Sequence, residues 1–567
     1  MLPPMLLALV TATFGAATPL DCPHHALLAS LYGPAHSANA QDAPDSKPQS
    51  AHPRELHLAN VLQLTFGGQN AEAYWNVEGT EITYQARQEG YPDEQIFRMK
   101  ADGSAKTLVS TGKGRCTCSY FSPDSRSIFF SSTHEKNEGA QPAVDMSQGY
   151  VWRVNPQFSL FRRDLATNAL TRIIEKDAYV AETTIDPAGR YMVFTGTFDG
   201  DLEIYRANLD GTNIQRLTHE VGYDGGPFVS WDGQKIVYRR DTLETEAEVN
   251  DYKRLLAMDL VRPGKLDIWI MNADGTGQQQ VTRLAGASFA PFLHPNGKQI
   301  IFSSNFHDPR GREFDLFVVN TDGTGLRQVT FTPEFDGFPM FSKDGKKLLW
   351  ASNRHGSVEG ETNIFVADWV EEPPVESVIV EASNDVWVYE FASNQDQDSF
   401  LRVWGSGLPV AAYGEAPDDS VSLVEFPKTT LPAGEIVSAR LILTHAAPTG
   451  SQREHLRTHP VELFSVAPGI DEKRWVKDLA IDHWPAGSAL ARGVVMEDGP
   501  EGAFHVAFDV TNDMKEWRTN FSEKGLAFAL FSSLPVGDLG RDAIYKFFSR
   551  NAADPTVRPR LEIVVRK

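Results

Sequence analysis

The stretch from Ser288 to Asn305 reads SFAPFLHPNGKQIIFSSN, and it is followed from Glu313 to Thr330 by EFDLFVVNTDGTGLRQVT. Two apolar runs flank a Pro-Asn-Gly turn in the first part. A third run leads through an Asp-Gly turn into a short fourth run in the second part. Apolar runs of this length, joined by turns with Gly where positive φ is needed, are typical of antiparallel strands. The stretch therefore predicts one four-stranded antiparallel sheet.

The first of these turns occurs six times in the chain. Its last residues are Gly79, Ser125, Gly189, Gly233, Gly297 and Gly345. They are separated by 46, 64, 44, 64 and 48 residues, and the two long spacings contain insertions of about 20 residues at Lys136 to Asn155 and at Glu244 to Lys265. A period of about 40–50 residues with four short strands indicates a β-propeller, because each sheet buries its faces against its neighbours around a channel. We predict a six-bladed propeller over residues 55–370.

The two ends of the repeat predict how the ring closes. The sixth unit ends at Ile364 to Asp368 without a fourth strand of its own, whereas Val61 to Thr65 before the first unit has the fourth-strand pattern. We therefore expect the N-terminal strand to complete the last blade. The second insertion has a helical pattern from Glu246 to Met258, and we expect it to cover one face of the propeller as a lid.

Composition and the N-terminal segment restrict the partners and the location. The formal net charge of −22 argues against binding to nucleic acid or to an anionic membrane surface, since both require a basic face. The apolar run Leu6 to Leu20 and the small-residue site Ala38 to Ala40 predict an export signal over residues 1–40, followed by a disordered tether over 41–54. We expect a periplasmic or secreted protein without a membrane span.

Acidic residues near the start of several first strands are candidate metal ligands. Glu182, Asp224 and Asp336 are expected to converge on the channel axis, where a divalent cation such as calcium would neutralise them. His134 and His307 follow second strands and would favour a transition metal if they joined in. The alternative is that the carboxylates cap turns and the histidines are solvated.

The turn sequences resemble those of TolB-type propellers. Ser122 to Ser125, Asn208 to Thr212 and Asn272 to Thr276, with Arg216-Leu-Thr and Gln328-Val-Thr, carry this resemblance over roughly residues 55–370. It implies a six-bladed propeller of a periplasmic protein and says little about activity, because this fold has many functions.

After a linker at 371–376 the repeat disappears. Residues 377–567 contain about eight alternating strand patterns, which predict a jelly-roll β-sandwich. Asp385, Leu431 to Gly434, Glu472, Asp509 to Thr511 and Arg550 resemble the DNRLRE domain, which implies a carbohydrate-binding module, although Asp396 to Ser399 departs from the family pattern. Aromatic rings and arginines are the side chains expected to bind a sugar. The candidates are Trp387, Arg402, Trp404, Trp475, Trp484 and Arg550. The alternative for Trp387 and Trp404 is a place in the core.

These observations favour an exported, non-catalytic protein that binds a polysaccharide or a cell-envelope protein. The chain has no Gly-x-Ser-x-Gly, His-Glu-x-x-His or P-loop motif. The alternative is a polysaccharide lyase working in the propeller channel. In that case His134, His307 or Tyr223 would be the base, and Glu182, Asp224 and Asp336 would hold a metal that stabilises the enolate.

Overall fold

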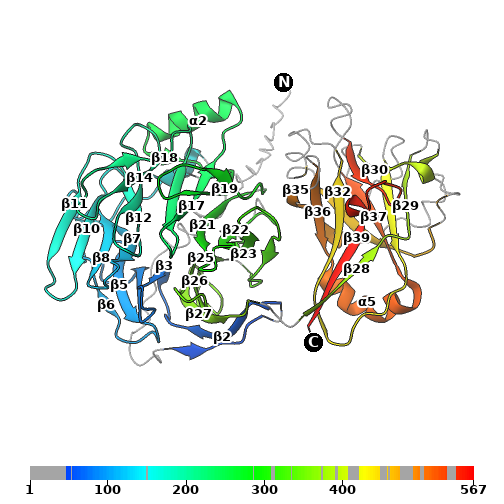
Figure 1. Ribbon diagram of the computed structural model, residues 1–567, viewed down its shortest axis with the longest axis horizontal. Coiled ribbons are helices and arrows are strands. Elements are labelled where there is room, and N and C mark those ends of the chain that lie inside the picture. The colour runs from blue at the N-terminus through cyan, green and yellow to red at the C-terminus, as the bar shows by residue number, and fades with distance from the viewer. Residues whose placement is uncertain are drawn as a thin grey trace, which may run out of the picture.

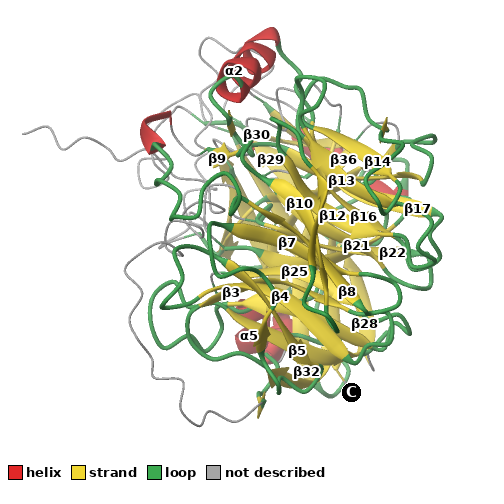
Figure 2. Cartoon of the chain, turned by 90° about the vertical axis from the view of Figure 1, so that its left-hand side faces the viewer, coloured by secondary structure: helices red, strands yellow, loops and turns green. Residues whose placement is uncertain are grey.

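The structure is a computed structural model. It describes residues 46–52, 54–148, 151–284, 286–307, 313–333, 335–371, 375–389, 394–405, 420–446, 456, 460–470, 472, 489–498, 503–532 and 544–566. Two lobes lie side by side in Figure 1, a propeller coloured blue to green and a sandwich coloured yellow to red. Turned by 90°, the molecule is built almost entirely of strands, with few helices (Figure 2).

The propeller has six blades, as the repeat predicts. In each of the first five blades, four antiparallel strands follow one another outward from the channel in chain order. Blade 1 contains β3 (Gln69–Trp75), β4 (Glu81–Arg87), β5 (Gln95–Lys100) and β6 (Thr107–Leu108). Blade 2 contains β7 (Cys116–Phe121), β8 (Ser127–Ser132), β10 (Ser159–Asp164) and β11 (Leu170–Ile174). Blade 3 contains β12 (Val180–Ile185), β13 (Met192–Gly196), β14 (Glu203–Ala207) and β15 (Gln215–Arg216). Blade 4 contains β16 (Asp224–Val229), β17 (Lys235–Asp241), β19 (Leu266–Asn272) and β20 (Gln279–Gln280). Blade 5 contains β21 (Ser288–Leu293), β22 (Gln299–Ser304), β23 (Asp315–Asn320) and β24 (Arg327–Gln328).

Blade 6 is closed by the N-terminal strand, which confirms the predicted seam. It contains β25 (Asp336–Phe341), β26 (Lys347–Ser352), β27 (Asn363–Trp369), β2 (Leu58–Gln63) and β1 (Lys47–Pro48). In the β2–β27 pair, Leu62 lies opposite Val366 and Gln63 opposite Phe365. The predicted disordered tether is wrong for residues 46–52 and 54, because β1 pairs with β2. The exposed edge of β2 offers backbone hydrogen-bond partners that composition alone does not reveal.

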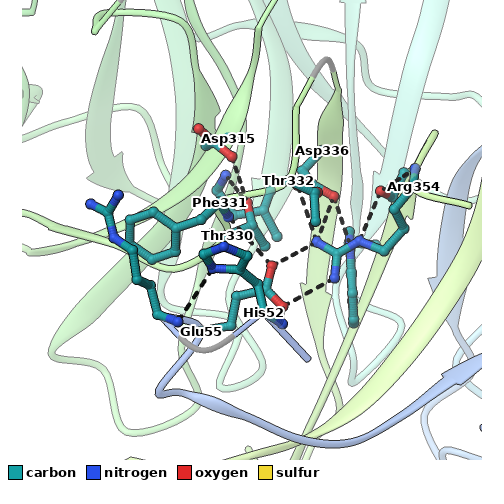
Figure 3. Close-up of polar contacts among 12 residues, drawn as sticks. His52, Glu55, Asp315, Thr330, Phe331, Thr332, Asp336 and Arg354 are labelled. Atoms are coloured by element: carbon teal, nitrogen blue, oxygen red, sulfur yellow. Dashed lines mark hydrogen bonds and ion pairs between the residues drawn. The ribbon is translucent and has the colours of Figure 1, made fainter. Parts of the chain in front are cut away.

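A buried arginine fixes this seam from inside (Figure 3). Both terminal nitrogens of Arg354 donate to the Glu55 carboxylate, at 3.2 and 2.9 Å, and Nη2 also donates to Asp336, at 3.0 and 3.1 Å. All three side chains are at most 2% exposed. Trp350 Nε1 and Thr332 Oγ1 donate to Asp336 as well. The N-terminal segment is therefore held to blade 6 by charges that lie out of contact with water.

The two insertions form one cover over the propeller. The helix α2 (Glu246–Leu256) has a capping box between Thr245 and Glu248, as its helical pattern predicts. The strands β9 (Trp152–Arg153) and β18 (Leu260–Val261) pair with each other and so connect the insertions of blades 2 and 4. Buried Tyr252 donates from its hydroxyl to Gly222 O at 3.0 Å, which holds α2 against blade 4.

The C-terminal lobe is the predicted jelly-roll sandwich with a core of its own. One sheet contains β28 (Val375–Glu381), β39 (Arg560–Arg566), β32 (Glu435–His445), β36 (Phe504–Asp509), β35 (Val494–Asp498), β38 (Tyr545–Phe548) and β30 (Phe400–Val403). The other contains β29 (Asn384–Val388), β31 (Val421–Phe426), β37 (Leu526–Ser532), β33 (Val461–Val466) and β34 (Ala491–Arg492).

Since β28 begins at Val375 and pairs with β39, the sandwich starts two residues before the predicted boundary. The helix α5 (Thr511–Lys524) was not predicted. None of the described helices is long and apolar enough to cross a membrane.

We expect replacement of Arg354 by methionine to destabilise the propeller by about 3–5 kcal/mol, because two buried carboxylates would lose their cation. The matched control is Lys347→Met in the same blade. Lys347 pairs with Asp368 at 2.7 Å, but the two side chains are 52% and 42% exposed, and such a pair contributes about 0–1 kcal/mol. Urea unfolding of the full chain measures both, and equal midpoints for the two variants would contradict a stabilising role for the buried arginine.

Candidate binding site

Each blade places one residue in a left-handed conformation beside the channel. The first strand of every blade shifts register after its second or third residue, as in a β-bulge, and the residue at the shift has a positive φ. These residues are Glu72, Cys118, Glu182, Gly226, Ala290 and Phe338, with φ between 48° and 60°. They all line one small cavity inside the ring. We call them the channel ring.

The channel ring stores backbone strain. Five of its six members are not glycine, and the left-handed conformation costs roughly 1–2 kcal/mol for such a residue. Strain of this kind persists only where the surrounding structure enforces it, and it gathers at functional sites. The polar members, Glu72, Cys118 and Glu182, come from consecutive blades, so one side of the ring is polar and the other is apolar.

Glu182 is held by an arginine from the next blade. Arg239 donates to Glu182 and to the hydroxyl of Tyr223, and the backbone N–H of Gly226 donates to Glu182 at 2.9 Å. A Cβ atom at Gly226 would collide with the Arg239 guanidinium, so glycine is what allows Arg239 to cross to blade 3. Burial opposes ionisation of Glu182, but Arg239 and these hydrogen bonds outweigh it and lower its pKa below the usual value.

The other two predicted metal ligands also have arginine partners. Arg240 donates to both oxygens of Asp224, at 2.5 and 2.9 Å, and Arg354 holds Asp336. Glu182, Asp224 and Asp336 do not come together as one ligand group among the described residues. The sequence showed the carboxylates but not the arginines that neutralise them, because each pair joins residues whose contact depends on strand register.

Glu72 has no arginine of its own within the described ring. Burial raises the pKa of Glu72 to about 7. Burial also raises the pKa of Cys118 well above that of an ordinary thiol, and Glu72 and Glu182 add to this shift, so the thiol is neutral and weakly reactive. Cys116 is free as well and is buried within blade 2.

The cavity inside the channel ring is too small for a sugar. Its volume is about 30 Å³, which is room for one water molecule. Trp152 of the first insertion covers the polar side, with its ring centroid 6.1 Å from that of Tyr223 and 5.7 Å from the Arg239 guanidinium. Tyr223, one of the predicted bases, therefore lies beneath Trp152, and its hydroxyl already accepts a hydrogen bond from Arg239.

The two predicted histidines lie elsewhere. His134 Nδ1 is 2.8 Å from Ser132 Oγ in blade 2, and its ring packs on Phe161. His307 lies at the end of β22 in blade 5, near Glu313 and Asp315. Neither histidine lines the channel cavity. The described residues thus do not assemble the histidine base and metal ligands that a lyase in the channel would need.

The sandwich candidates form two polar groups. Trp387 and Trp404 are 9% and 8% exposed and pack on each other, as the core alternative predicts. Trp387 Nε1 and Arg402 both donate to Asp398. Arg550 makes a bidentate pair with Glu472. Trp475 and Trp484 lie outside the described residues.

A large cavity lies between the lobes and was not predicted. It has a volume of about 1400 Å³ and is lined by blade 5, by Arg54, Leu56 and His57, and by both sheets of the sandwich. Arg54 bridges its two walls, donating to Asp509 at 2.7 Å while its guanidinium lies 4.1 Å from the Phe331 ring centroid. We call this cavity the interlobe cleft. A sequence pattern cannot show it, because its walls lie in different domains.

The raised pKa of Glu72 gives a test of the channel ring. The pKa of Glu72 is about 7 in the folded protein and about 4.5 in the unfolded chain. The protonated carboxyl therefore contributes stability that is fully present below about pH 4.5 and is lost as the pH rises through about 7. We expect the Glu72→Gln protein to melt close to the wild type at pH 5 and a few degrees above it at pH 8. Glu182→Gln is the control, since it loses Arg239 pairing and should melt lower at both pH values. A Glu72→Gln difference that is the same at pH 5 and pH 8 would contradict the raised pKa.

Parts of the chain are similar to known proteins. No family model matches the chain. A TolB homologue of Chlorobium chlorochromatii is 26% identical over 166 residues, which are 29% of this chain and 32% of the relative. An uncharacterized protein of Agrobacterium fabrum is 26% identical over 118 residues, 21% of this chain and 33% of the relative. The chain thus spans about a third of the length of the curated relatives it matches.

The crystal structure of TolB from Acinetobacter baumannii covers 54% of this chain and 65% of its own, with 19% identity and a TM-score of 0.36. Similarity at this level assigns neither an activity nor a ligand to the chain.

Proposed function

We propose that the protein is an exported, non-catalytic binding protein that holds a polysaccharide in the interlobe cleft. The propeller is the platform, and the sandwich is a carbohydrate-binding module that forms the opposite wall. The observation that carries this proposal is the size and position of the cleft. At about 1400 Å³ it exceeds the ~300–1000 Å³ of small-molecule sites, whereas the channel ring has room for one water.

The arginines of the cleft favour a ligand with carboxylate or sulfate groups. Three of the four arginines that line it already have a carboxylate partner: Arg54 pairs with Asp509, Arg440 with Glu562 and Arg492 with Glu462. The side chain of Arg327, on the outer strand of blade 5, makes no ion pair or hydrogen bond with another described residue. An exposed guanidinium facing a large cavity is suited to bidentate pairing with an anionic group.

The alternative function is a lyase acting in the channel. It would need a base and a metal close to an accessible carbon atom of the substrate. In the described channel Glu182 is paired with Arg239 and Trp152 covers Tyr223. This arrangement favours binding over catalysis.

Binding of acidic and neutral polysaccharides to the full chain and to residues 375–567 tests the proposal. The sandwich fragment should fold by itself, because β28 pairs with β39 within it and its core is separate. We expect the full chain to bind an acidic polysaccharide and the fragment to bind it more weakly, since the fragment lacks one wall of the cleft.

Two arginine variants sharpen the test. Arg327→Ala should weaken binding by about tenfold or more, as expected for loss of a charge-assisted hydrogen bond. Arg126→Ala, an exposed arginine in blade 2, is the control and should bind as the wild type does. An ultraviolet-absorbing unsaturated product from any of the polysaccharides would establish the lyase instead. If Arg327→Ala and Arg126→Ala bind the polysaccharide equally well, the proposal that the ligand binds in the cleft is wrong.

A further inference from the structure

A histidine and two carboxylates converge on the propeller wall of the interlobe cleft. His307 Nε2 lies 3.3 Å from Asp315 Oδ2 and 3.9 Å from Glu313 Oε1, and one ligand atom from each residue lies within 4.8 Å of the others. Bonds of about 2.0–2.1 Å to a tetrahedral ion place neighbouring ligand atoms about 3.3–3.4 Å apart. We propose that these three residues bind a divalent transition-metal ion, such as Zn²⁺ or Mn²⁺.

Asp315 by itself has a structural role. Thr330, two residues after the fourth strand, donates to its Oδ1, at 3.3 Å. The same contact recurs in other blades between the third strand and a hydroxyl that follows or ends the fourth, as in Thr282 with Asp267 and Thr65 with Asn363. A carboxylate at this position is therefore not evidence for a metal. The distinctive feature of blade 5 is the histidine and the second carboxylate beside it.

Comparison with blade 6 shows what blade 5 lacks. The segment from Ser304 to His307 occupies the same positions at the end of its second strand as the segment from Ser352 to His355 in blade 6. In blade 6 Arg354 neutralises buried carboxylates, and in blade 5 a phenylalanine takes its place. Asp315 is fully buried, and the charges of Asp336, Glu313 and Arg354 all act on it. Arg354 is paired with Asp336 and Glu55, so a bound cation would stabilise the charges of Asp315 and Glu313 directly.

The surroundings of His307 suit a metal ligand. Neither ring nitrogen makes a hydrogen bond of good geometry with the described residues, although both are buried. Phe306 and Phe317 pack around the ring, with centroids 6.0 and 5.8 Å away, and fix its orientation. Gln328 Nε2 donates to Asp315 Oδ2 at 2.8 Å and orients it.

The ion proposed here would face the cleft. His307 and Glu313 both line the cavity, so coordination positions not filled by the protein open toward it. One imidazole nitrogen with carboxylate oxygens favours Zn²⁺ or Mn²⁺ over Ca²⁺ and Mg²⁺, which prefer oxygen ligands alone.

Metal titration of the full chain tests the site. The protein is prepared without a polyhistidine tag, stripped of metal and titrated calorimetrically with Zn²⁺, Mn²⁺, Ca²⁺ and Mg²⁺. We expect one Zn²⁺ or Mn²⁺ per chain, bound at least tenfold more tightly than Ca²⁺ or Mg²⁺, with a rise in melting temperature. Co²⁺ should give visible absorption bands of a protein-bound ion.

The variants use the equivalence of blades 5 and 6. His307→Ala and Glu313→Gln should each weaken binding at least tenfold, and Glu313→Gln, whose parent side chain is 42% exposed, should melt like the metal-free wild type. His355→Asn, at the same position of blade 6, is the control and should bind metal like the wild type. The proposal is overturned if the wild type binds no ion in a one-to-one ratio. It is equally overturned if Glu313→Gln, folded and stable, binds as the wild type does.

Discussion

The ion network around Arg354 is the constraint on which the ring depends. A propeller closes only if its first and last segments meet, and here the meeting strands, β2 and β27, come from opposite ends of the domain. Backbone pairing alone would leave the seam as easy to open as any sheet edge. Arg354 instead lies between Glu55 of the N-terminal segment and Asp336 of blade 6, with all three buried. Separating the seam would leave charges unpaired in the interior, so the closed ring is strongly favoured over an open one.

Within the closed ring, one backbone device is repeated with different side chains. Every first strand carries a residue of positive φ at the channel, yet these residues range from Glu72 and Cys118 to Ala290 and Phe338. The bulge is therefore a requirement of the blade, and the side chain placed on it is free to vary. That freedom makes the channel polar on one side. Arg239 neutralises Glu182 there, and Trp152 covers the pair.

The sequence predicts whatever repeats, and much less of what does not. Turn residues such as Gly297 and Gly345 recur because each blade needs the same φ, so blade number, seam and insertions follow from spacing. The arginine partners of Glu182, Asp224 and Asp336 could not be found this way. Arg239 and Arg240 come from another strand, and Arg354 comes from the loop after β26. Burial of Trp387 and Trp404 was one of two alternatives that the strand pattern allowed. The interlobe cleft depends on how two domains meet, for which the chain carries no periodic signal.

Departures from the repeat are consequently the places where function can lie. The second strands of blades 5 and 6 lead into the same four-residue pattern, Ser-Asn-x-His, but Phe306 stands where blade 6 has Arg354. In blade 6 the Arg354 guanidinium neutralises the buried carboxylates of Glu55 and Asp336 and so stabilises the closed ring. In blade 5 Phe306 stands at that position, His307 and Glu313 line a large cavity, and the buried Asp315 lies close to both. The two blades thus differ at the position where an arginine neutralises buried carboxylates, and the metal site proposed for blade 5 lies beside the phenylalanine that stands there.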